Sequence, residues 1–378
     1  MSKIIAAGHI CLDITPAFPD AAIADIGSYL VPGRLIDMHG VTISTGGSVA
    51  NTGLALHVLG ADAVLMGKTG TDAFGDLIYG ILSTYGCESG LLRTAGEQTS
   101  YSIVLALPGM DRIFLHDAGA NDTYCLEDIP QEVLQDAAVF HFGYPTLMRT
   151  MYQEEGRELL ALMKHVKHAG AATSLDMSDV NETSKSGAVN WRHVLQQVLP
   201  YVDFFLPSVE ELLYMLHRDL YETCQKRAGR KDLTLFITEE EVQLLGTAVL
   251  QMGAKIVLIK CGAAGLFLFT ADQTVLRQIP DEVLPDKAAW SDQKRFEKSF
   301  VPHQILSASG AGDTTIAAFL HAVTTGCTPK QAVQYAAATG ALCVGSYDAV
   351  SAIRPFDELE QLIEAGWAKQ DLLYKGGC

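Results

Sequence analysis

The chain has 378 residues, of which 48% are hydrophobic and 19% charged, enough for one large core or two unequal ones. A formal net charge of −17 argues against an extended nucleic-acid-binding surface, because such surfaces are basic. The eight cysteines include no Cys-x-x-Cys pair, which argues against a zinc site and favours reduced thiols in a cytoplasmic protein. The first residues predict a strand rather than a signal peptide, and no apolar run is long enough to span a bilayer.

Short apolar runs alternate with helical patterns along most of the chain. The runs have the length and composition of buried parallel strands, and they cover Ile4–Cys11, Ala63–Met66, Ala138–Phe142, Ala171–Asp176, Val202–Leu206 and Ile256–Lys260. Helical patterns are expected at residues 52–59, 154–168, 209–217, 239–252, 312–325, 329–345 and 356–369. This order predicts an α/β protein with a three-layer α/β/α fold around a central, mostly parallel sheet.

Two early stretches interrupt the alternation. Residues 14–45 contain three prolines, and residues 99–119 predict two strands, Ser100–Leu107 and Arg112–His116, joined by a turn at 108–111. We therefore expect a small β unit made of 14–45 and 99–119. The α/β domain would comprise the remaining segments, 1–13, 46–98 and 120–378. A later polar stretch, 281–299, is expected to be a surface insertion.

The stretch Ser307–Asp313 is a small-residue loop that runs into an apolar helical pattern. Gly310, Ala311 and Gly312 carry almost no side chain, so their backbone N–H groups can close on an anion at the start of a helix. Asp313 stands at the edge of this predicted anion site, where a carboxylate can take the proton of a hydroxyl that attacks phosphorus. The alternative is that Asp313 only caps the helix.

A second glycine-rich segment precedes the first predicted helix. Gly46-Gly47-Ser48-Val49-Ala50-Asn51 is followed by a helix, a strand and the turn Gly67-Lys68-Thr69-Gly70-Thr71-Asp72-Ala73-Phe74-Gly75. Together with Ser307–Asp313, these stretches resemble the ribokinase-like (PfkB) family of carbohydrate kinases, and they occur in the family's order over nearly the whole chain. The resemblance implies a ribokinase-like fold, a small β lid over the sugar, and phosphorylation of a sugar hydroxyl by ATP with Asp313 as the base. The two lid stretches could also be surface hairpins without a gating role.

Four residues are candidates for holding the acceptor. Asp13 follows the first predicted strand, where open α/β sheets bind ligands, and its carboxylate can accept hydrogen bonds from two hydroxyls. Gly46 and Gly47 permit close approach of the backbone, and the Asn51 amide has both a donor and an acceptor. The resemblance implies that all four face the sugar. For Asp13 the alternative is a turn-forming residue.

The resemblance also implies a nucleotide side. Lys260, Gly262 and Gly265 match its phosphate-side turn, Asp176 matches a strand-end aspartate near the phosphates, and Gly340 and Cys343 would line the adenine. Lys260 could instead be a buried lysine with a structural partner.

Glu211 and Ser307 bear on the ions that the resemblance implies. Pro207-Ser208-Val209-Glu210-Glu211 is similar to the family's Asn-x-x-Glu element, with Ser208 in place of Asn. Glu211 would organise Mg²⁺ through water, or it would only be a glutamate near a helix N-terminus. Ser307 stands where cation-activated members often carry Asp, which argues against dependence on a monovalent cation.

Gly67-Lys68-Thr69 is not a P-loop, because six residues separate Gly60 from Gly67, whereas four separate the glycines of that motif. Lys68 could still touch a substrate, but it is expected at the surface. Gly46–Asn51 contains no cation for a second phosphate, which disfavours phosphosugar acceptors, although Arg34, Lys68 or Arg112 could supply one.

Three other functions were compared with a sugar kinase: a nucleoside kinase on the same fold, a sugar-sensing homologue without catalysis, and a nicotinamide-dependent oxidoreductase. The last is disfavoured because no Gly-x-Gly-x-x-Gly follows the first strand. A homodimer through the lid strands is expected from their exposed edges and from the family resemblance.

Overall fold

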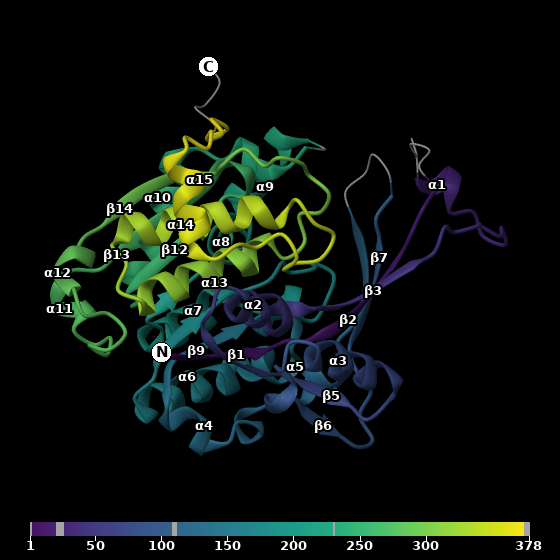
Figure 1. Cartoon of the computed structure of the whole chain (residues 1–378), viewed down its shortest axis with the longest axis horizontal. Helices are drawn as coiled ribbons and strands as arrows, with labels where there is room; N and C mark the ends of the chain where they lie inside the picture. Colours follow the sequence, from purple (N-terminus) through teal and green to yellow (C-terminus); the bar gives the residue numbers. More distant parts are fainter. Residues whose placement is uncertain (1, 20–25, 108–111, 230, 374–378) are drawn as a thin grey trace.

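The computed structural model describes residues 2–19, 26–107, 112–229 and 231–373 (Figure 1). The main sheet has eight strands in the order β14-β13-β12-β11-β10-β9-β1-β4. Neighbouring strands from β12 to β4 pair in parallel, and β13 and β14 pair antiparallel at one edge. The strands are β1 (Lys3–Gly8), β4 (Asp62–Met66), β9 (Ala137–Gly143), β10 (Ala172–Leu175), β11 (Phe204–Phe205), β12 (Ile256–Lys260), β13 (Gly265–Thr270) and β14 (Lys294–Lys298).

Each face of the main sheet is buried under its own set of helices. Successive residues of β1 point to opposite faces, so that Ile5 belongs to one core and Ile4 to the other. The core containing Ile5 includes α5 (Arg149–Tyr152), α6 (Arg157–Ala169), α7 (Trp191–Val198), α8 (Val209–Leu216), α9 (Arg218–Ala228) and α10 (Glu239–Gln251). The core containing Ile4 includes α2 (Gly47–Val58), α3 (Ala73–Ser83), α11 (Gln273–Leu276), α12 (Lys287–Trp290), α13 (Ala311–Thr324), α14 (Pro329–Cys343) and α15 (Phe356–Glu364). The predicted three-layer fold is confirmed.

A second, four-stranded sheet has the order β3-β2-β7-β8. Its strands are β2 (Cys11–Pro16), β3 (Val41–Gly46), β7 (Tyr101–Leu105) and β8 (Ile113–Asp117), and they extend away from the helical layers (Figure 1). The predicted hairpin is present as the antiparallel pair β7–β8, while its turn at 108–111 lies outside the described residues. The division into two domains and the role of this sheet as a lid stay predictions.

The first predicted strand is divided between the two sheets. β1 ends at Gly8 and pairs with β4 and β9, whereas Cys11 begins β2 of the four-stranded sheet. Asp13 therefore lies inside β2, opposite Ser44 of β3, and not in a turn after the first strand. The apolar run is continuous in the sequence because both sheets bury part of it.

The stretch 281–299 is not a surface insertion, and that expectation was wrong. It contains α12 and β14, and β14 extends the main sheet by pairing with β13. Val283, Leu284 and Trp290 are buried, and the Trp290 ring meets that of Phe319 edge-on at 6.0 Å. A few apolar residues among many charges are enough to attach this segment to the core.

The remaining short elements complete the path of the chain. They are α1 (Ile26–Tyr29), α4 (Gln131–Gln135), the parallel pair β5 (Lys68–Gly70) and β6 (Leu92–Thr94), and several short 3-10 helices such as Pro145–Leu147. In the described ranges, no helix combines the length and the apolar character that crossing a membrane requires.

Candidate active site

Asp313 lies in the first turn of α13, and only 2% of its surface is exposed. Gly310, in a left-handed conformation, holds the N-cap position of this helix. The Asp313 carboxylate instead accepts hydrogen bonds from two side chains of distant segments. The Asn51 amide donates to Oδ2 over 2.9 Å, and the Tyr144 hydroxyl lies 2.8 Å from both Oδ1 and Oδ2. Asp313 is therefore not a capping residue.

The charge state of Asp313 is set by opposing effects. Burial raises the pKa of its carboxyl, while the hydrogen bonds from Asn51 and Tyr144 and the positive charge of Lys260 oppose this rise. A buried carboxylate with a raised pKa and specific donors is suited to accepting a proton at neutral pH.

Asp13 and the predicted glycines form a second part of the site. A Cβ on Gly46 would lie 2.2 Å from Asp13 Oδ2, and one on Gly47 would lie 2.6 Å from His9 Nδ1. Burial raises the pKa of Asp13 to about 6, against hydrogen bonds from Cys11 and Ser102 and the charge of Arg112. Only glycine leaves space for the carboxylate at position 46.

Asn51 and Cys11 each contact one of the two aspartates. Asn51 donates a hydrogen bond to Asp313, and Cys11 donates one to Asp13. Asn51 lies four residues after Gly47 on α2, so the two share one face of the helix. The Cys11 thiol donates to Asp13 Oδ1 over 3.4 Å, and the charges of Asp13 and, more weakly, Asp313 add to the effect of burial in raising its pKa. The structure thus brings the four predicted acceptor residues towards the predicted base.

The four-stranded sheet also reaches the loop before α13. Arg112, just before β8, donates through Nη1 to the Ser309 hydroxyl. His116 on β8 contacts His9 Nε2 at 3.2 Å and Ser102 Oγ at 3.0 Å. Burial lowers the pKa of both histidines, and for His9 the neighbouring His116 adds to this effect. Neither histidine belongs to a motif that predicts a site from the sequence.

A cavity of about 1220 Å³ opens beside Asp313. Its wall includes most of the residues predicted for phosphate and nucleotide: Glu211, Lys260, Gly262, Gly265, Gly310, Ala311, Gly312, Asp313 and Gly340. Cys343 lies behind the loop, with its thiol 3.6 Å from the Ser309 carbonyl oxygen, and burial raises its pKa to about 11. The predicted nucleotide residues therefore surround one space, with Cys343 as a support of its wall.

Lys260 and Glu211 have structural partners as well as a place on the cavity wall. Lys260 Nζ lies 2.7 Å from Asp176 Oδ1. Glu211 forms a capping box with Ser208 at the start of α8, where its Oε2 accepts the Ser208 N–H over 2.7 Å. Burial alone would lower the pKa of Lys260. The negative charges of Asp176 and Glu211 have the larger effect, so the pKa of Lys260 is raised above its usual value. The position of Lys260 is thus compatible with phosphate binding and with a structural ion pair. The position of Glu211 is compatible with organising Mg²⁺ and with capping its helix.

All of the site residues described above lie in the part of the chain that matches a family model. The family model described as "pfkB family carbohydrate kinase" matches residues 2–355. The chain belongs to the pfkB family of carbohydrate kinases.

Curated relatives match about half of the chain at low identity. Fructokinase-1 of Zea mays is 26% identical over 180 residues, which are 46% of this chain and 50% of the relative. A Solanum tuberosum fructokinase is 26% identical over 176 residues, again 46% and 50%. The chain thus spans about half the length of these curated relatives.

Several solved structures share this fold over nearly the whole chain. Arabidopsis thaliana ribokinase, complexed with ribose and ATP, has a TM-score of 0.69 at 20% identity and covers 96% of this chain and 98% of its own. Fructokinase from Xylella fastidiosa with bound ATP gives the same values. A nucleoside kinase from Methanocaldococcus jannaschii has a TM-score of 0.63 at 16% identity, over 97% and 99%.

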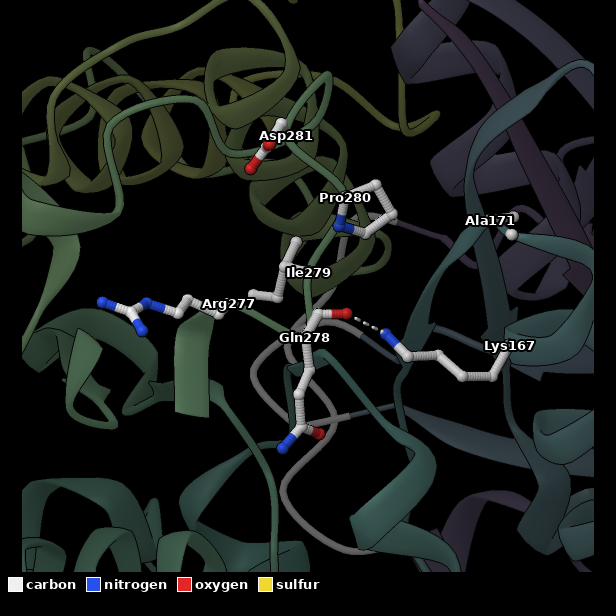
Figure 2. Close-up of a pocket in the computed structure, with 8 residues that line it drawn as sticks. Lys167, Ala171, Arg277, Gln278, Ile279, Pro280 and Asp281 are labelled. Carbon is white, nitrogen blue, oxygen red and sulfur yellow. Dashed lines mark hydrogen bonds between the residues drawn. The ribbon is translucent and has the colours of Figure 1, made fainter. Parts of the chain in front are cut away.

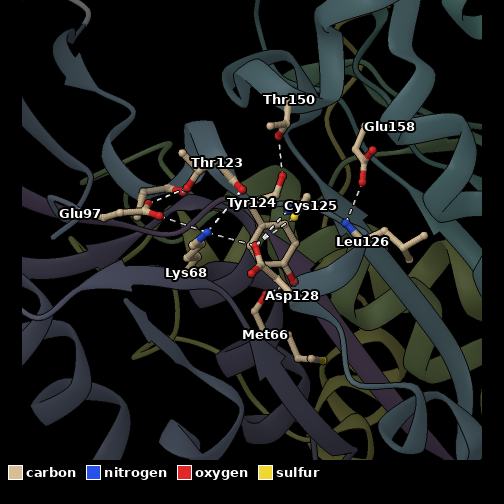
Figure 3. A network of polar contacts seen from close by, with 11 residues as sticks. Met66, Lys68, Glu97, Thr123, Tyr124, Cys125, Leu126, Asp128, Thr150 and Glu158 are labelled. Carbon is tan, nitrogen blue, oxygen red and sulfur yellow. Dashed lines mark hydrogen bonds and ion pairs between the residues drawn. The ribbon is translucent and has the colours of Figure 1, made fainter. Parts of the chain in front are cut away.

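Lys68 of this pfkB family member is buried, and the expectation of a surface lysine was wrong. Its ammonium lies 3.3 Å from Glu97, 3.2 Å from Asp128 and 3.4 Å from the Thr123 carbonyl oxygen (Figure 3). Figure 3 shows these groups converging on Lys68 from other segments, so the lysine joins β5 to the chain around 123–128.

A smaller cavity of about 320 Å³ lies away from the candidate active site, beside the segment after α11. Lys167 at its edge donates to the Gln278 carbonyl oxygen over 2.8 Å and pairs with Asp203 at 2.6 Å. Arg277 points away from Lys167 (Figure 2). Lys167 therefore joins α6 to neighbouring segments.

Proposed function

We propose that this chain transfers the γ-phosphoryl group of ATP to a hydroxyl group of a carbohydrate. The observation that carries this proposal is the position of Asp313, buried between Asn51 of α2 and the cavity bordered by Gly310–Gly312. A base at this position can serve an acceptor on one side and a phosphate on the other.

The reaction would use Asp313 as the proton acceptor. The acceptor hydroxyl gives its proton to Asp313 as its oxygen forms a bond to the γ-phosphorus. The bond from that phosphorus to the oxygen shared with the β-phosphate breaks, and ADP leaves with that oxygen. The backbone N–H groups at the start of α13 would stabilise charge on the phosphoryl oxygens.

The acceptor would be held by Asp13 and Asn51 above the backbone of Gly46 and Gly47. The fructokinase and ribokinase names of the relatives support a sugar as the first choice. The four-stranded sheet would act as the lid, since Arg112 already reaches the loop before Asp313 and a lid excludes water from phosphoryl transfer.

ATP would occupy the large cavity, with its phosphates near Lys260, Gly262 and Gly265 and its adenine near Gly340. Cys343 would act only through the loop that it supports. A second copy of the chain would cover the exposed side chains of the four-stranded sheet.

Mg²⁺ would reach this cavity with the nucleotide. The Oε2 atom of Glu211 accepts the Ser208 N–H, so Oε1 is the oxygen that would face the ion or its water. Asp179 and Glu210 also line the cavity wall. No three His, Cys, Asp or Glu side chains gather as a metal site within the described ranges. The donor set therefore fits an ion held by phosphates and water, because Mg²⁺ often binds proteins through few carboxylates. When bound, it would neutralise phosphate charge.

The test is a coupled ADP-release assay with Mg-ATP over a panel of sugars and nucleosides, with the variant Asp313→Asn beside the wild type. We expect release that depends on a sugar and falls by ~10²–10⁴-fold in the variant, because the base is lost. Asp357→Asn, an exposed aspartate in the first turn of α15, is the matched control and should retain activity. Near-full activity of Asp313→Asn would remove Asp313 as the base, and ATP binding without turnover would favour a sensor.

A further inference from the structure

Tyr144 stands at a sharp corner of the backbone beside the candidate base. It follows β9 directly and adopts a left-handed conformation, with φ 65° and ψ 42°. Such a conformation is unfavourable for a residue other than glycine and persists where the surroundings enforce it. Here Pro145 follows the corner, and at Gly143 a Cβ would lie 1.7 Å from Ser48 Oγ, so α2 packs tightly against it.

The hydroxyl of Tyr144 is shared between the two oxygens of Asp313, at 2.8 Å from each. Asn51 adds a donor to Oδ2 alone, at 2.9 Å. An ionised carboxylate has about two acceptor positions on each oxygen. Among the described residues, both Tyr144 and Asn51 reach Oδ2, whereas of these two only Tyr144 reaches Oδ1, so Oδ1 is the less occupied oxygen of the pair. The side chain of Thr52, the residue after Asn51, also lowers the pKa of the Asp313 carboxyl.

We propose that Tyr144 is a positioning residue that, together with Asn51, fixes the plane of the Asp313 carboxylate and leaves Oδ1 as the atom that takes the acceptor's proton. The inference rests on the proposed kinase function and deepens it. Tyr144, which also lines the large cavity, acts through Asp313, and the left-handed corner holds its ring in the required direction.

Burial and the charges around Asp313 keep the hydroxyl of Tyr144 protonated, so it remains a hydrogen-bond donor. Burial raises the pKa of Tyr144 well above its usual value, and the charges of Asp313 and Asp176 raise it further, so the phenol stays protonated. Charged or titratable groups that act on Tyr144 or Asp313 come from several elements: Cys11, Asp176, Glu211, Lys260 and Cys343. The side chains of Tyr144, Asn51 and Thr52 act on Asp313 without carrying a charge, so a conservative substitution can remove each of them without removing a charge.

Tyr144→Phe removes the hydroxyl and keeps the ring. The base must be ionised to act, and loss of a donor raises its pKa, so the acidic limb of the pH profile of kcat/KM should move to higher pH. The loss of activity should be greatest at low pH and smaller at pH 9, whereas a general packing defect lowers the profile at every pH. Tyr124→Phe, which removes another buried hydroxyl bonded to the Met66 carbonyl oxygen, should leave the limb in place.

A second measurement does not depend on turnover. In protein labelled with ¹³C at aspartate carboxyl groups, the Asp313 signal can be assigned by its loss in Asp313→Asn and then titrated. Its midpoint should rise in Tyr144→Phe and fall in Tyr144→3-fluorotyrosine, whose phenol is a stronger donor. Unchanged midpoints together with an unmoved acidic limb would overturn the proposal. A wild type without acceptor-dependent turnover would refute the kinase function, while the titration would still decide whether Tyr144 holds Asp313.

Discussion

At the scale of single residues, the sequence predicted the surroundings of Asp313, Asn51 and the glycines near them. Their motifs carry the spacing of a loop before a helix, so their neighbourhood could be predicted from local pattern alone. Tyr144 could not be found in this way, because its contact with Asp313 depends on the end of β9 and on a left-handed corner. The signal was its place at the carboxyl end of a parallel strand, where α/β sheets bind ligands.

The burial of Lys68, by contrast, could not be predicted from the sequence. The turn around Lys68 lacks the P-loop spacing, which left a surface position as the expectation, but its carboxylate partners, Glu97 and Asp128, come from later segments. Long-range ion pairs of this kind leave no periodic signal in a single sequence.

Gly46 offers a test of the acceptor side. In Gly46→Ala the new Cβ would lie 2.2 Å from Asp13 Oδ2, so the carboxylate must move. We expect kcat/KM for the acceptor to fall by up to ~10²-fold, mainly through KM, while KM for ATP stays near the wild-type value. Gly80→Ala on α3, where a Cβ meets open space, is the matched control. Equal effects of both variants on acceptor KM would count against Asp13 as an acceptor ligand.

At the scale of elements, the parallel strands were predicted well because buried strands are continuous apolar runs. The prediction failed where one run serves two sheets, at β1 and β2, and where an edge strand is polar, at β14. β14 has the composition of a surface segment because four of its five residues are Lys, Arg or Glu, although only Lys294 is exposed and Glu297 is buried.

Trp290 tests the corrected role of the 281–299 segment. It is 2% exposed and packs on Phe319 of α13, the helix that carries Asp313. Trp290→Ala should lower the free energy of unfolding by about 3–5 kcal/mol, because it leaves a cavity in the core. Trp367→Ala, at a partly exposed tryptophan near Phe300, should cost less. Chemical denaturation of both variants measures this difference, and equal losses would contradict the role of the segment as part of the core.

At the scale of the whole molecule, alternation of strand and helix was enough to predict three layers, and the family match over residues 2–355 agrees with them. The identity of the acceptor could not be predicted. On the proposed function it would depend on side chains from β2, α2 and β8, whose relative positions are set by the packing of two sheets.

The four-stranded sheet exposes an apolar surface that bears on assembly. Val41 and Ile43 on β3 and Ile113, Phe114 and Leu115 on β8 are each at least 36% exposed, and β3 and β8 are the edge strands. We expect a second copy to cover them, since exposed apolar edges favour pairing. Sedimentation equilibrium should give a dimer that Phe114→Glu weakens. A monomer at high protein concentration would dismiss this arrangement.

Phosphorus NMR of a reaction with Mg-ATP and the sugar that stimulates ADP release tests the kinase proposal most directly. We expect a new phosphomonoester signal that grows in step with ADP in the wild type and is nearly absent in Asp313→Asn. Inorganic phosphate in place of the ester, or equal ester formation in the variant, would contradict phosphoryl transfer with Asp313 as its base.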